Sequence, residues 1–492
     1  MSVSAVKSMC KIIAAMAFAV PLELAAAPKV VYVVPGGAGE KDGTSWENAY
    51  GSVHDAYASA AAFAEGGFDS GEVWVKRGMY IWPSKNSAIT MVSGVSVRGG
   101  FVGTETSADQ ADGAANVTVF SGDLQSDAYW CPDGIAPKPI EAKHRIWTGD
   151  NDHLVYNEPN PDGTDKYWAI NKSLNDVQKA FSGNGVTGCE FTGLHFACFV
   201  TSAISLSNTT GGAVTFRKCL FLGNDGAQNG GLYDGGIHCV YGHCSIYDCE
   251  FVANWSQLSY ATDTLATGTG YTVISNCVFR KMASSGFYLR LESSAGLDDN
   301  TYRLQNCVFK DNYGSSMISV NATKLFRLNV EDCLFVSNRT VGSSIVYSQA
   351  NSAGQMKFRR CVFADNVISN ASNGACSGCV AMGGWGRGFF FNDCLFARNT
   401  LTYTGTTSGA AVIGQLLASY VSTAFVNCTF DRNKTISTAE GTYACIIGFL
   451  TDYMSLGIAT APFAPTSARL PVKMLSTIRL TSTQRNHRAV PA

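Results

Sequence analysis

Three acidic residues stand at equal intervals in the middle of the chain: Asp234, Asp263 and Glu292 follow one another at steps of 29 residues. This step matches one period of the repeat described below, so the three carboxylates would form one column if successive repeats stack in register. Carboxyl groups about 5 Å apart suit a retaining glycosidase, and groups about 6.5–9.5 Å apart suit an inverting one. Three carboxylates on one face could instead hold the calcium ion that a polysaccharide lyase would need.

Arg290 is the basic residue that best accompanies this column. It lies two residues before Glu292 and would share its strand face. Its guanidinium would offset the repulsion between the carboxylates and could stabilise developing negative charge. The alternative is a solvated acidic face, because a drift of one residue in register would turn a side chain inward. Asp234, Asp263, Glu292 and Arg290 are therefore catalytic candidates only if the protein is an enzyme.

The element that must position these side chains is a repeat of the form Cys-x-Phe-x-x-Asn, with steps of 26 to 34 residues between cysteines. The copies begin at Cys219, Cys249, Cys277, Cys307, Cys333, Cys361, Cys394 and Cys428. One copy has Met282 in place of the asparagine, and a weaker copy begins at Cys189. Cys and Phe are two residues apart and share one strand face, so stacked repeats predict a phenylalanine ladder in the core and an asparagine ladder at the bends.

The residue before the cysteine is Asp or Asn in six of the eight copies, with Lys218 and Arg360 as the exceptions. Asn and Asp tolerate the left-handed conformation of a tight bend best among residues other than glycine. The segments are β-branched and aromatic with an apolar period of two, which excludes a helical repeat. The sequence therefore predicts an all-β protein, a single right-handed parallel β-helix with an N-terminal capping helix.

The chain divides into five parts by composition. Lys7 and Lys11, the apolar run 12–20 and the small residues 25–27 predict a signal peptide over residues 1–27. Residues 28–124 would form the N-terminal cap and first coils, with a helix over 52–63 that begins at a capping box of Ser52 and Asp55. Residues 125–182 interrupt the repeat, 183–449 carry the regular coils, and 450–492 form a basic tail that we expect to be disordered.

Net charge and hydropathy limit the classes of partner that the protein could bind. The formal net charge is −2, which gives no electrostatic case for nucleic acid or an anionic membrane as the main partner. Beyond the signal, no segment reaches the about 18 consecutive apolar residues of a membrane span. We expect a secreted or cell-surface protein that meets an extracellular polysaccharide or a cell-surface component.

The cysteines at the repeat position would point inward, with their Cβ vectors side by side. That arrangement favours a ladder of reduced, buried thiols over disulfides between coils. Outside the ladder, the pairs Cys239/Cys244 and Cys376/Cys379 could close short loops. His238 and His243, beside the first pair, are the best case for a zinc site, although their spacing is unlike that of known zinc motifs.

The repeat also resembles known groups. The Phe-x-x-Asn unit with nearby Gly-Gly-Ala-Val at 211–214 and Gly-Gly-Ile at 235–237 resembles the polymorphic outer-membrane-protein repeat. The start of the chain, with Asp-Gly-Thr-Ser-Trp at 42–46 and Gly-Gly-Phe at 99–101, resembles secreted bacterial pectin-lyase-like β-helix proteins. The resemblance implies the fold and export. It does not imply an activity, because the fold serves lyases, hydrolases, adhesins and inert stalks alike.

Two functions remain open from the sequence. One is a non-catalytic role in binding, adhesion or surface structure. The other is a polysaccharide lyase or glycoside hydrolase acting on extracellular glycans, with calcium as the cofactor of a lyase and no cofactor otherwise.

Overall fold

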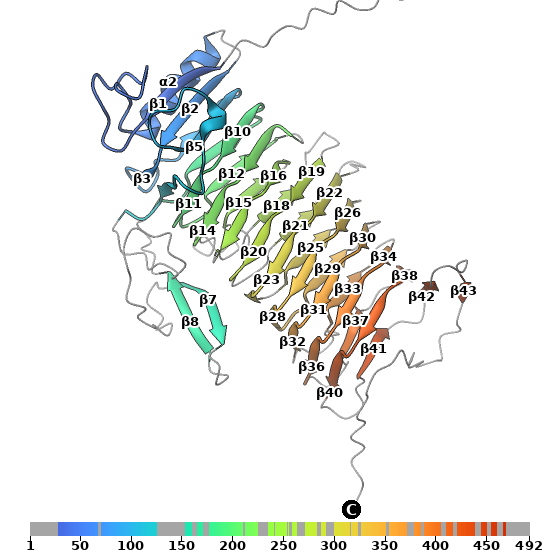
Figure 1. The fold of residues 1–492 in the computed structure, drawn as a ribbon. Helices are drawn as coiled ribbons and strands as arrows, with labels where there is room; N and C mark the ends of the chain where they lie inside the picture. Colours follow the sequence, from blue (N-terminus) through green and yellow to red (C-terminus); the bar gives the residue numbers. More distant parts are fainter. Residues whose placement is uncertain are drawn as a thin grey trace, which may run out of the picture.

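The computed structural model is a long solenoid of short parallel strands (Figure 1). It describes residues 28–66, 70–124, 153–159, 165–170, 177–209, 212–224, 235–240, 242–252, 254, 258–262, 271–282, 287–291, 300–314, 316–322, 326–350, 354–370, 378–384, 388–404, 410–416, 421–437, 444–449, 454–459 and 466–468. Each coil contributes one strand to each of three long sheets, which we call A, B and C. A shorter sheet, E, joins them in the later coils.

The strands of sheet A are β1 Lys29–Val33, β2 Gly71–Lys76, β5 Val95–Phe101, β10 Cys189–Thr192, β13 Val214–Arg217, β16 Ser245–Tyr247, β19 Tyr271–Ser275, β22 Asn300–Gln305, β26 Phe326–Glu331, β30 Gln355–Arg359, β34 Gly388–Asn392, β38 Val421–Val426, β42 Met454–Ala459 and β43 Thr466–Ala468. The strands of sheet B are β3 Gly78–Ile81, β6 Thr118–Ser121, β11 His195–Ala197, β14 Leu220–Leu222, β17 Glu250–Val252, β20 Val278–Arg280, β23 Val308–Lys310, β27 Leu334–Val336, β31 Val362–Ala364, β35 Leu395–Ala397 and β39 Thr429–Asp431.

The strands of sheet C are β4 Ile89–Thr90, β9 Phe181–Asn184, β12 Ile204–Ser207, β15 Ile237–Val240, β18 Leu258–Thr262, β21 Phe287–Leu291, β25 Ile318–Ala322, β29 Val346–Ala350, β33 Val380–Gly384, β37 Ala410–Leu416 and β41 Ala444–Phe449. Those of sheet E are β24 Tyr313–Gly314, β28 Arg339–Val341, β32 Val367–Asn370, β36 Thr400–Tyr403 and β40 Lys434–Ser437. A separate antiparallel pair, β7 His153–Pro159 and β8 Asp165–Ile170, lies within the predicted insertion.

A capping helix covers the N-terminal end of the solenoid, as predicted. Helix α2, Val53–Glu65, begins at Ser52, whose side chain accepts a hydrogen bond from the Asp55 N–H. It packs its buried stripe of Val53, Ala56, Tyr57 and Ala60 against the first coils. A solenoid end exposes core and unpaired strand, so this helix protects the first coil from water. One short 3₁₀ helix, η1 at Ala108–Gln110, lies in a loop of the same region.

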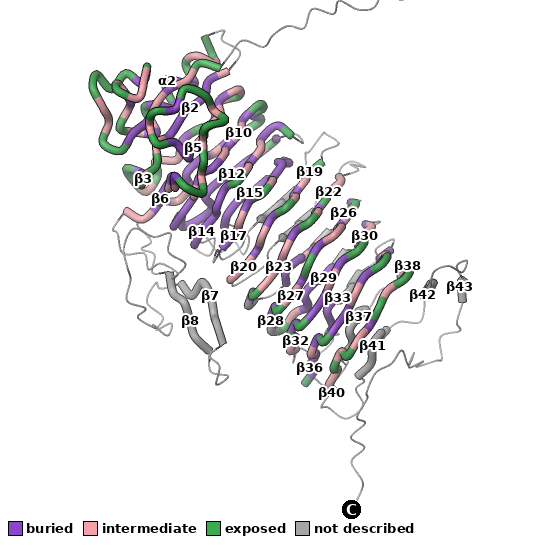
Figure 2. The backbone as a smooth tube through the Cα atoms, viewed as in Figure 1, coloured by how far each residue is buried: buried purple, intermediate pink, exposed green. Residues whose placement is uncertain are grey.

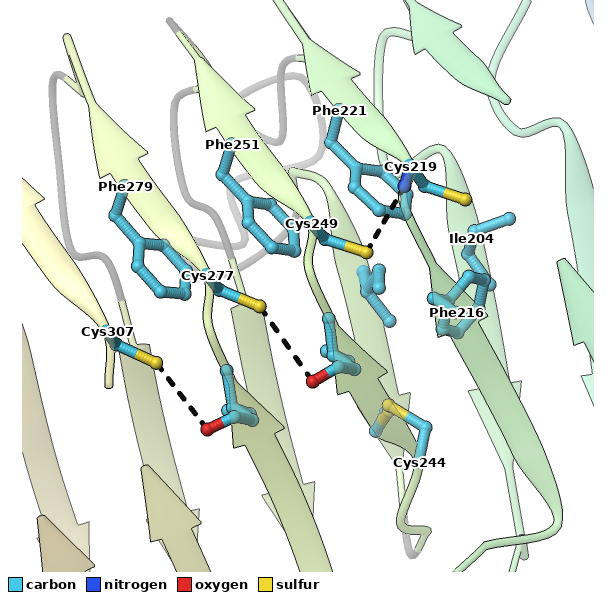
Figure 3. Packing of buried hydrophobic residues seen from close by; sticks show 14 of the residues in the cluster. Ile204, Phe216, Cys219, Phe221, Cys244, Cys249, Phe251, Cys277, Phe279 and Cys307 are labelled. Atoms are coloured by element: carbon cyan, nitrogen blue, oxygen red, sulfur yellow. Dashed lines mark hydrogen bonds between the residues drawn. The ribbon is translucent and has the colours of Figure 1, made fainter. Parts of the chain in front are cut away.

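The predicted phenylalanine ladder is present (Figure 3). Neighbouring rings stack almost in parallel, with centroids 4.5 to 4.9 Å apart. The ladder runs through Phe221, Phe251, Phe279, Phe309, Phe335, Phe363, Phe396 and Phe430. It is the centre of the core, because β-strand spacing puts equivalent side chains of successive coils in direct contact.

The cysteines form a second ladder beside it, with side chains that point the same way (Figure 3). All but Cys428 are buried, and all are reduced thiols. Each sulfur lies against backbone carbonyls. The Sγ of Cys361, for example, donates to the carbonyls of Val330 at 3.3 Å and Arg359 at 3.4 Å. Burial raises the pKa of the Cys249 thiol, so this side chain is an uncharged thiol that fills space in the core.

The asparagine ladder ties one bend to the next. The Asn366 amide donates to the side-chain oxygen of Asn399 at 2.8 Å and to the Phe335 carbonyl at 2.8 Å, and its own oxygen accepts from the Asn338 amide at 3.0 Å. The same pattern joins Asn312 to Asn338. These side chains are buried, and their hydrogen bonds run along the solenoid axis in place of water.

The repeat has two bends in which one residue adopts the left-handed conformation: one before the ladder cysteine and one before the ladder asparagine. All eight residues before the ladder cysteines have φ between 50° and 56°, including the exceptions Lys218 and Arg360. A second left-handed column, which the sequence did not predict, lies directly before the ladder asparagines and before Met282, which takes the place of one of them. Its members are Gly223, Lys281, Asp311, Ser337, Asp365, Arg398 and Arg432.

Two strands lie beyond residue 449, where the regular repeats were predicted to end. Strand β42 pairs in parallel with β38, and β43 pairs antiparallel with β42. The solenoid therefore continues into the segment that the sequence assigned to a basic tail. Along the strands whose burial is described, Figure 2 shows buried residues alternating with exposed or half-buried ones.

Met282 offers a direct test of the asparagine ladder. It is fully buried at the ladder position, and its N–H already donates to the Asn312 side-chain oxygen at 3.1 Å. We expect Met282→Asn to cost less than about 1 kcal/mol, because the new amide enters a column of amides. The matched change Met317→Asn, at a fully buried position outside the ladder, should cost about 3 kcal/mol. Denaturant midpoints compare the two, and equal losses would contradict the ladder account.

Candidate functional site

The predicted acidic column falls on a part of the chain of which little is described. Asp234, Asp263 and Glu292 lie outside the described residues, and the backbone of Arg290 lies on strand β21. The register of the residues just before them is known: Thr262 of β18 pairs with Leu291 of β21. The column and its role therefore stay predictions.

The outer face of sheet A is the described surface on which charged and aromatic side chains gather. Its strands alternate between buried residues that face the core and polar residues that face outward, as in β26, where Phe326, Leu328 and Val330 are buried. In parallel register, one outward row runs Trp74, Arg98, Thr192, Arg217, Tyr247 across five coils. Sheet B carries one apolar outward row, with Val308, Leu334 and Val362, beside charged residues such as Glu250 and Arg280.

Charged side chains of this row form a network with the neighbouring row. The Arg98 Nε lies 2.9 Å from the Glu72 carboxylate, and its Nη2 lies 3.8 Å from Glu190. Arg217 reaches Glu190 from the other side at 3.3 Å, and its guanidinium lies 4.3 Å from the Tyr247 ring centroid. Each carboxylate here has a cationic neighbour, an arrangement that holds side chains in place on an exposed face.

An aromatic cluster borders this network at the N-terminal end. The rings of Trp74 and Phe101 stack at 4.7 Å, Tyr32 meets Trp46 edge-on at 4.7 Å, and Trp46 donates its indole N–H to the Glu105 carbonyl. Trp74 is only 4% exposed. Trp74 and Phe101 therefore pack against the sheet and leave little ring surface for a ligand, whereas Tyr32 and Trp46 are half-buried.

A basic strip crosses sheet A further along the solenoid. It consists of Arg303 on β22, Arg327 on β26, and Lys357 and Arg359 on β30, and all four residues are exposed. In register, Arg303 pairs with Asn329, which pairs with Lys357, so two cations stand two coils apart in one row. Glu331 is the one acidic residue among the outward positions of these three strands. The basic strip therefore presents a net positive surface with a regular repeat.

Ion pairs also run along the left-handed bends. Arg360 lies 2.5 Å from Asp332 of the preceding coil, and Arg398 lies 2.6 Å from Asp365. The hydrogen bonds and charge of these arginines lower the pKa of both aspartates. Each pair joins the bends of two successive coils, so these ion pairs stabilise the stacking of the coils.

These pairs predict a pH dependence. A lowered pKa in the folded state means that the pair stabilises above the ordinary aspartate range, and that this contribution is lost as pH falls through the folded pKa. We expect Arg398→Ala to flatten the fall in melting temperature between about pH 5 and pH 2 slightly, and Arg77→Ala to leave the curve unchanged. Parallel curves for wild type and Arg398→Ala would contradict the assignment.

A shallow pocket of about 230 Å³ lies beside the capping helix. Its wall includes Pro35, His54, Tyr80, Trp82 and Pro83. The His54 ring nitrogen lies 2.6 Å from the Ser87 carbonyl and its ring packs against Trp82. No carboxylate lines this pocket, so it lacks the acid–base pair that glycoside cleavage requires.

Metal ligands do not gather in the described segments. No group of three or more His, Cys, Asp or Glu side chains there could hold a metal ion. His238 and His243, the best zinc candidates from the sequence, are not part of such a group. No helix of the described residues is long and apolar enough to cross a membrane.

The sequence missed the outer face of sheet A. Glu72 and Arg98 are 26 residues apart and Glu190 and Arg217 are 27 apart, but the insertion separates Arg98 from Glu190. The sequence does mark outward positions, because two polar residues flank an inward apolar one, as Arg303 and Gln305 flank Leu304. This alternation does not show which outward residues of different coils lie next to each other.

A family model described as a right-handed β-helix region matches residues 179–363. No curated protein matches the sequence significantly. Solved structures are similar at low identity. The catalytic domain of a GH87 α-1,3-glucanase in complex with nigerose is 11% identical with a TM-score of 0.44, over 79% of this chain and 64% of that one. The chain thus spans less than two thirds of the glucanase domain.

Two further structures differ in what they do. Pectate lyase Pel9A is 14% identical with a TM-score of 0.36, over 85% of this chain and 79% of that one. PfbA, a surface adhesin of Streptococcus pneumoniae, is 8% identical with a TM-score of 0.33, over 84% of this chain and 90% of that one. The fold itself rests on the sheet topology and the family model: the described strands stack as a parallel β-helix, and residues 179–363 match a right-handed β-helix region.

Proposed function

We propose that this is an extracellular or cell-surface protein that binds acidic polysaccharide, without cleaving it, through the outer face of sheet A. The observation that carries the proposal is the basic strip: Arg303, Arg327, Lys357 and Arg359 are exposed on three consecutive coils. A polymer of acidic sugars presents carboxylates at regular intervals, and a solenoid presents cations at regular intervals of about 4.8 Å per coil.

The chemistry of the strip favours carboxylates. Arginine offers a planar fork of donors that matches a carboxylate in two hydrogen bonds, whereas lysine adds a mobile point charge. The strands that carry these residues are held by the Phe and Asn ladders, so the backbone is already ordered and binding loses only the entropy of the exposed side chains. Glu331 is the one carboxylate among the outward positions of these three strands, and it stands beside Arg359 in register. Further along sheet A, Glu72 and Glu190 are paired with arginines, an arrangement suited to structure.

A panel of polysaccharides tests the proposal. The purified protein would run in native gels that contain polygalacturonate, alginate, dextran or arabinoxylan, and the same mixtures would be assayed for reducing ends and unsaturated products, with and without calcium. We expect retardation by the two acidic polymers, none by the two neutral ones, and no products. Retardation by neutral polymers alone, or by none, would overturn the proposal.

An enzyme is the second candidate, as a polysaccharide lyase or a glycoside hydrolase. It is favoured by the register of β18 and β21, in which Ala261 pairs with Arg290 and Thr262 pairs with Leu291. Asp263 directly follows Thr262, and Glu292 directly follows Leu291. Asp234, Asp263 and Glu292 would then act with Arg290, and a lyase would use calcium at these carboxylates. If the panel yields products, Asp263→Asn should abolish them while the control Asp311→Asn, at an exposed bend, should not. Equal turnover in both variants would exclude this site.

A further inference from the structure

Cys239 and Cys244 differ from the ladder cysteines because they belong to the same coil and their sulfur atoms are within 4 Å of each other. The Sγ of Cys239 donates to the Sγ of Cys244 across 3.8 Å, and the two residues are five apart in sequence. Cys239 lies in β15 and Cys244 directly precedes β16, so they stand at the two ends of one corner. Both are buried, with exposures of 1% and 0%.

The corner between them is fixed by the coils on either side. The His243 N–H donates to the Thr209 carbonyl at 2.9 Å, and the Thr209 hydroxyl donates to the His243 carbonyl at 2.9 Å. On the following coil, the Thr272 hydroxyl lies 2.9 Å from His243 Nδ1. The backbone next to Cys244 is thus held in position, and a disulfide here requires the 3.8 Å between the sulfurs to close to about 2.05 Å.

The ladder cysteines lack this arrangement. Their Cβ vectors run side by side in register, and their sulfurs donate to backbone carbonyls, as Cys249 does to Tyr247 at 3.2 Å. A disulfide needs Cβ vectors that converge and a dihedral angle near 90° about the sulfurs. The two groups of cysteines should therefore differ in oxidation although both are buried.

We propose that Cys239 and Cys244 form a disulfide when the chain folds in an oxidising compartment, which the extracellular location proposed above would supply. The oxidant is a disulfide donor of the glutathione class. One cysteine thiolate attacks the donor to form a mixed disulfide and releases one donor thiol, and the second cysteine then displaces the other. The protein loses two protons and two electrons, and the donor gains them as two thiols.

Burial sets the time at which this exchange takes place. A donor cannot reach sulfurs with exposures of 1% and 0% in the finished solenoid. The bond therefore forms while the coils are still assembling, and it is then protected from reductants. It locks the corner between sheets C and A in the coil that carries β15 and β16.

Peptide mapping tests the proposal, because Tyr241 lies between the two cysteines and Tyr247 follows the second. The protein would be refolded with a mixture of reduced and oxidised glutathione, blocked with N-ethylmaleimide under denaturing conditions and digested with chymotrypsin. Cleavage after Tyr241 separates the cysteines, so a peptide pair joined across this site reports the disulfide. We expect this pair as the main linked species, and its loss after refolding in dithiothreitol alone.

Variants make the result specific. Cys239→Ser and Cys244→Ser should each lose the linked pair and leave the other cysteine blocked by N-ethylmaleimide, whereas the ladder control Cys361→Ser should keep it. Blocked thiols at both positions in the wild-type protein, or links that scatter over the ladder cysteines, would overturn the proposal. Binding to acidic polysaccharide should be the same in oxidised and reduced protein, so failure of this proposal is distinct from failure of the binding function.

Discussion

Replacement of Asn366 by alanine is expected to lower the free energy of unfolding by about 4 kcal/mol, because each buried group left without a partner costs about 1–3 kcal/mol. The Asn366 side chain donates to the Phe335 carbonyl and to Asn399, and it accepts from the backbone and the side chain of Asn338. All of these partners are in a region closed to water, since Asn366 is fully buried. The alanine variant leaves them unsatisfied.

Guanidinium chloride unfolding measures the change, with Asn329→Ala as the control. Asn329 is an asparagine on the outer face of β26, where substitution should change the free energy by less than about 0.5 kcal/mol. Equal midpoints for the two variants would mean that the asparagine ladder does not hold the coils together.

Replacement of Phe335 by alanine is expected to cost about 3–5 kcal/mol, the usual range for the loss of a buried phenylalanine. Phe335 is fully buried and stacks on Phe309 at 4.8 Å and on Phe363 at 4.6 Å. Its removal opens a cavity in the middle of the ladder, which the neighbouring coils cannot fill because their spacing is fixed by β-sheet hydrogen bonds.

The adjacent residue provides the control for this variant. Leu334 points outward from the same strand and is 39% exposed. Leu334→Ala should cost less than about 1 kcal/mol in the same denaturant titration. A loss as large as that of Phe335→Ala would contradict the assignment of inward and outward positions on β27.

Features repeated in each coil were predictable from the sequence. The phenylalanine, cysteine and asparagine ladders recur at fixed spacing within the unit, so one alignment of the copies places them all, and the helix at Ser52 has a capping signal of its own. The left-handed bends before the cysteines carry Asp or Asn in most copies and could be inferred. The second bend column could not, because Lys281, Ser337 and Arg398 share no chemical property that marks a left-handed residue.

Contacts between outward side chains could not be predicted from the sequence, for a different reason. Coil length varies, so a pair such as Asp332 and Arg360, 28 residues apart, has a different separation from Asp365 and Arg398, 33 apart. Only the register of the sheets decides which outward residues meet. The same holds for the basic strip, in which Arg303 and Lys357 share a row only because Asn329 pairs with both.

The proposed binding face can be tested by one comparison of charge-matched variants. Arg303→Ala/Lys357→Ala removes two cations from the basic strip, and Arg77→Ala/Lys434→Ala removes two exposed cations elsewhere on the solenoid. Their affinities for polygalacturonate would be measured by biolayer interferometry at low and high salt. We expect the strip variant to bind at least about tenfold more weakly than wild type at low salt. Its affinity should also depend less on salt, because salt weakens binding by screening charges and the variant has fewer charges in the interface. Equal affinities and salt dependences for the two double variants would contradict binding through sheet A.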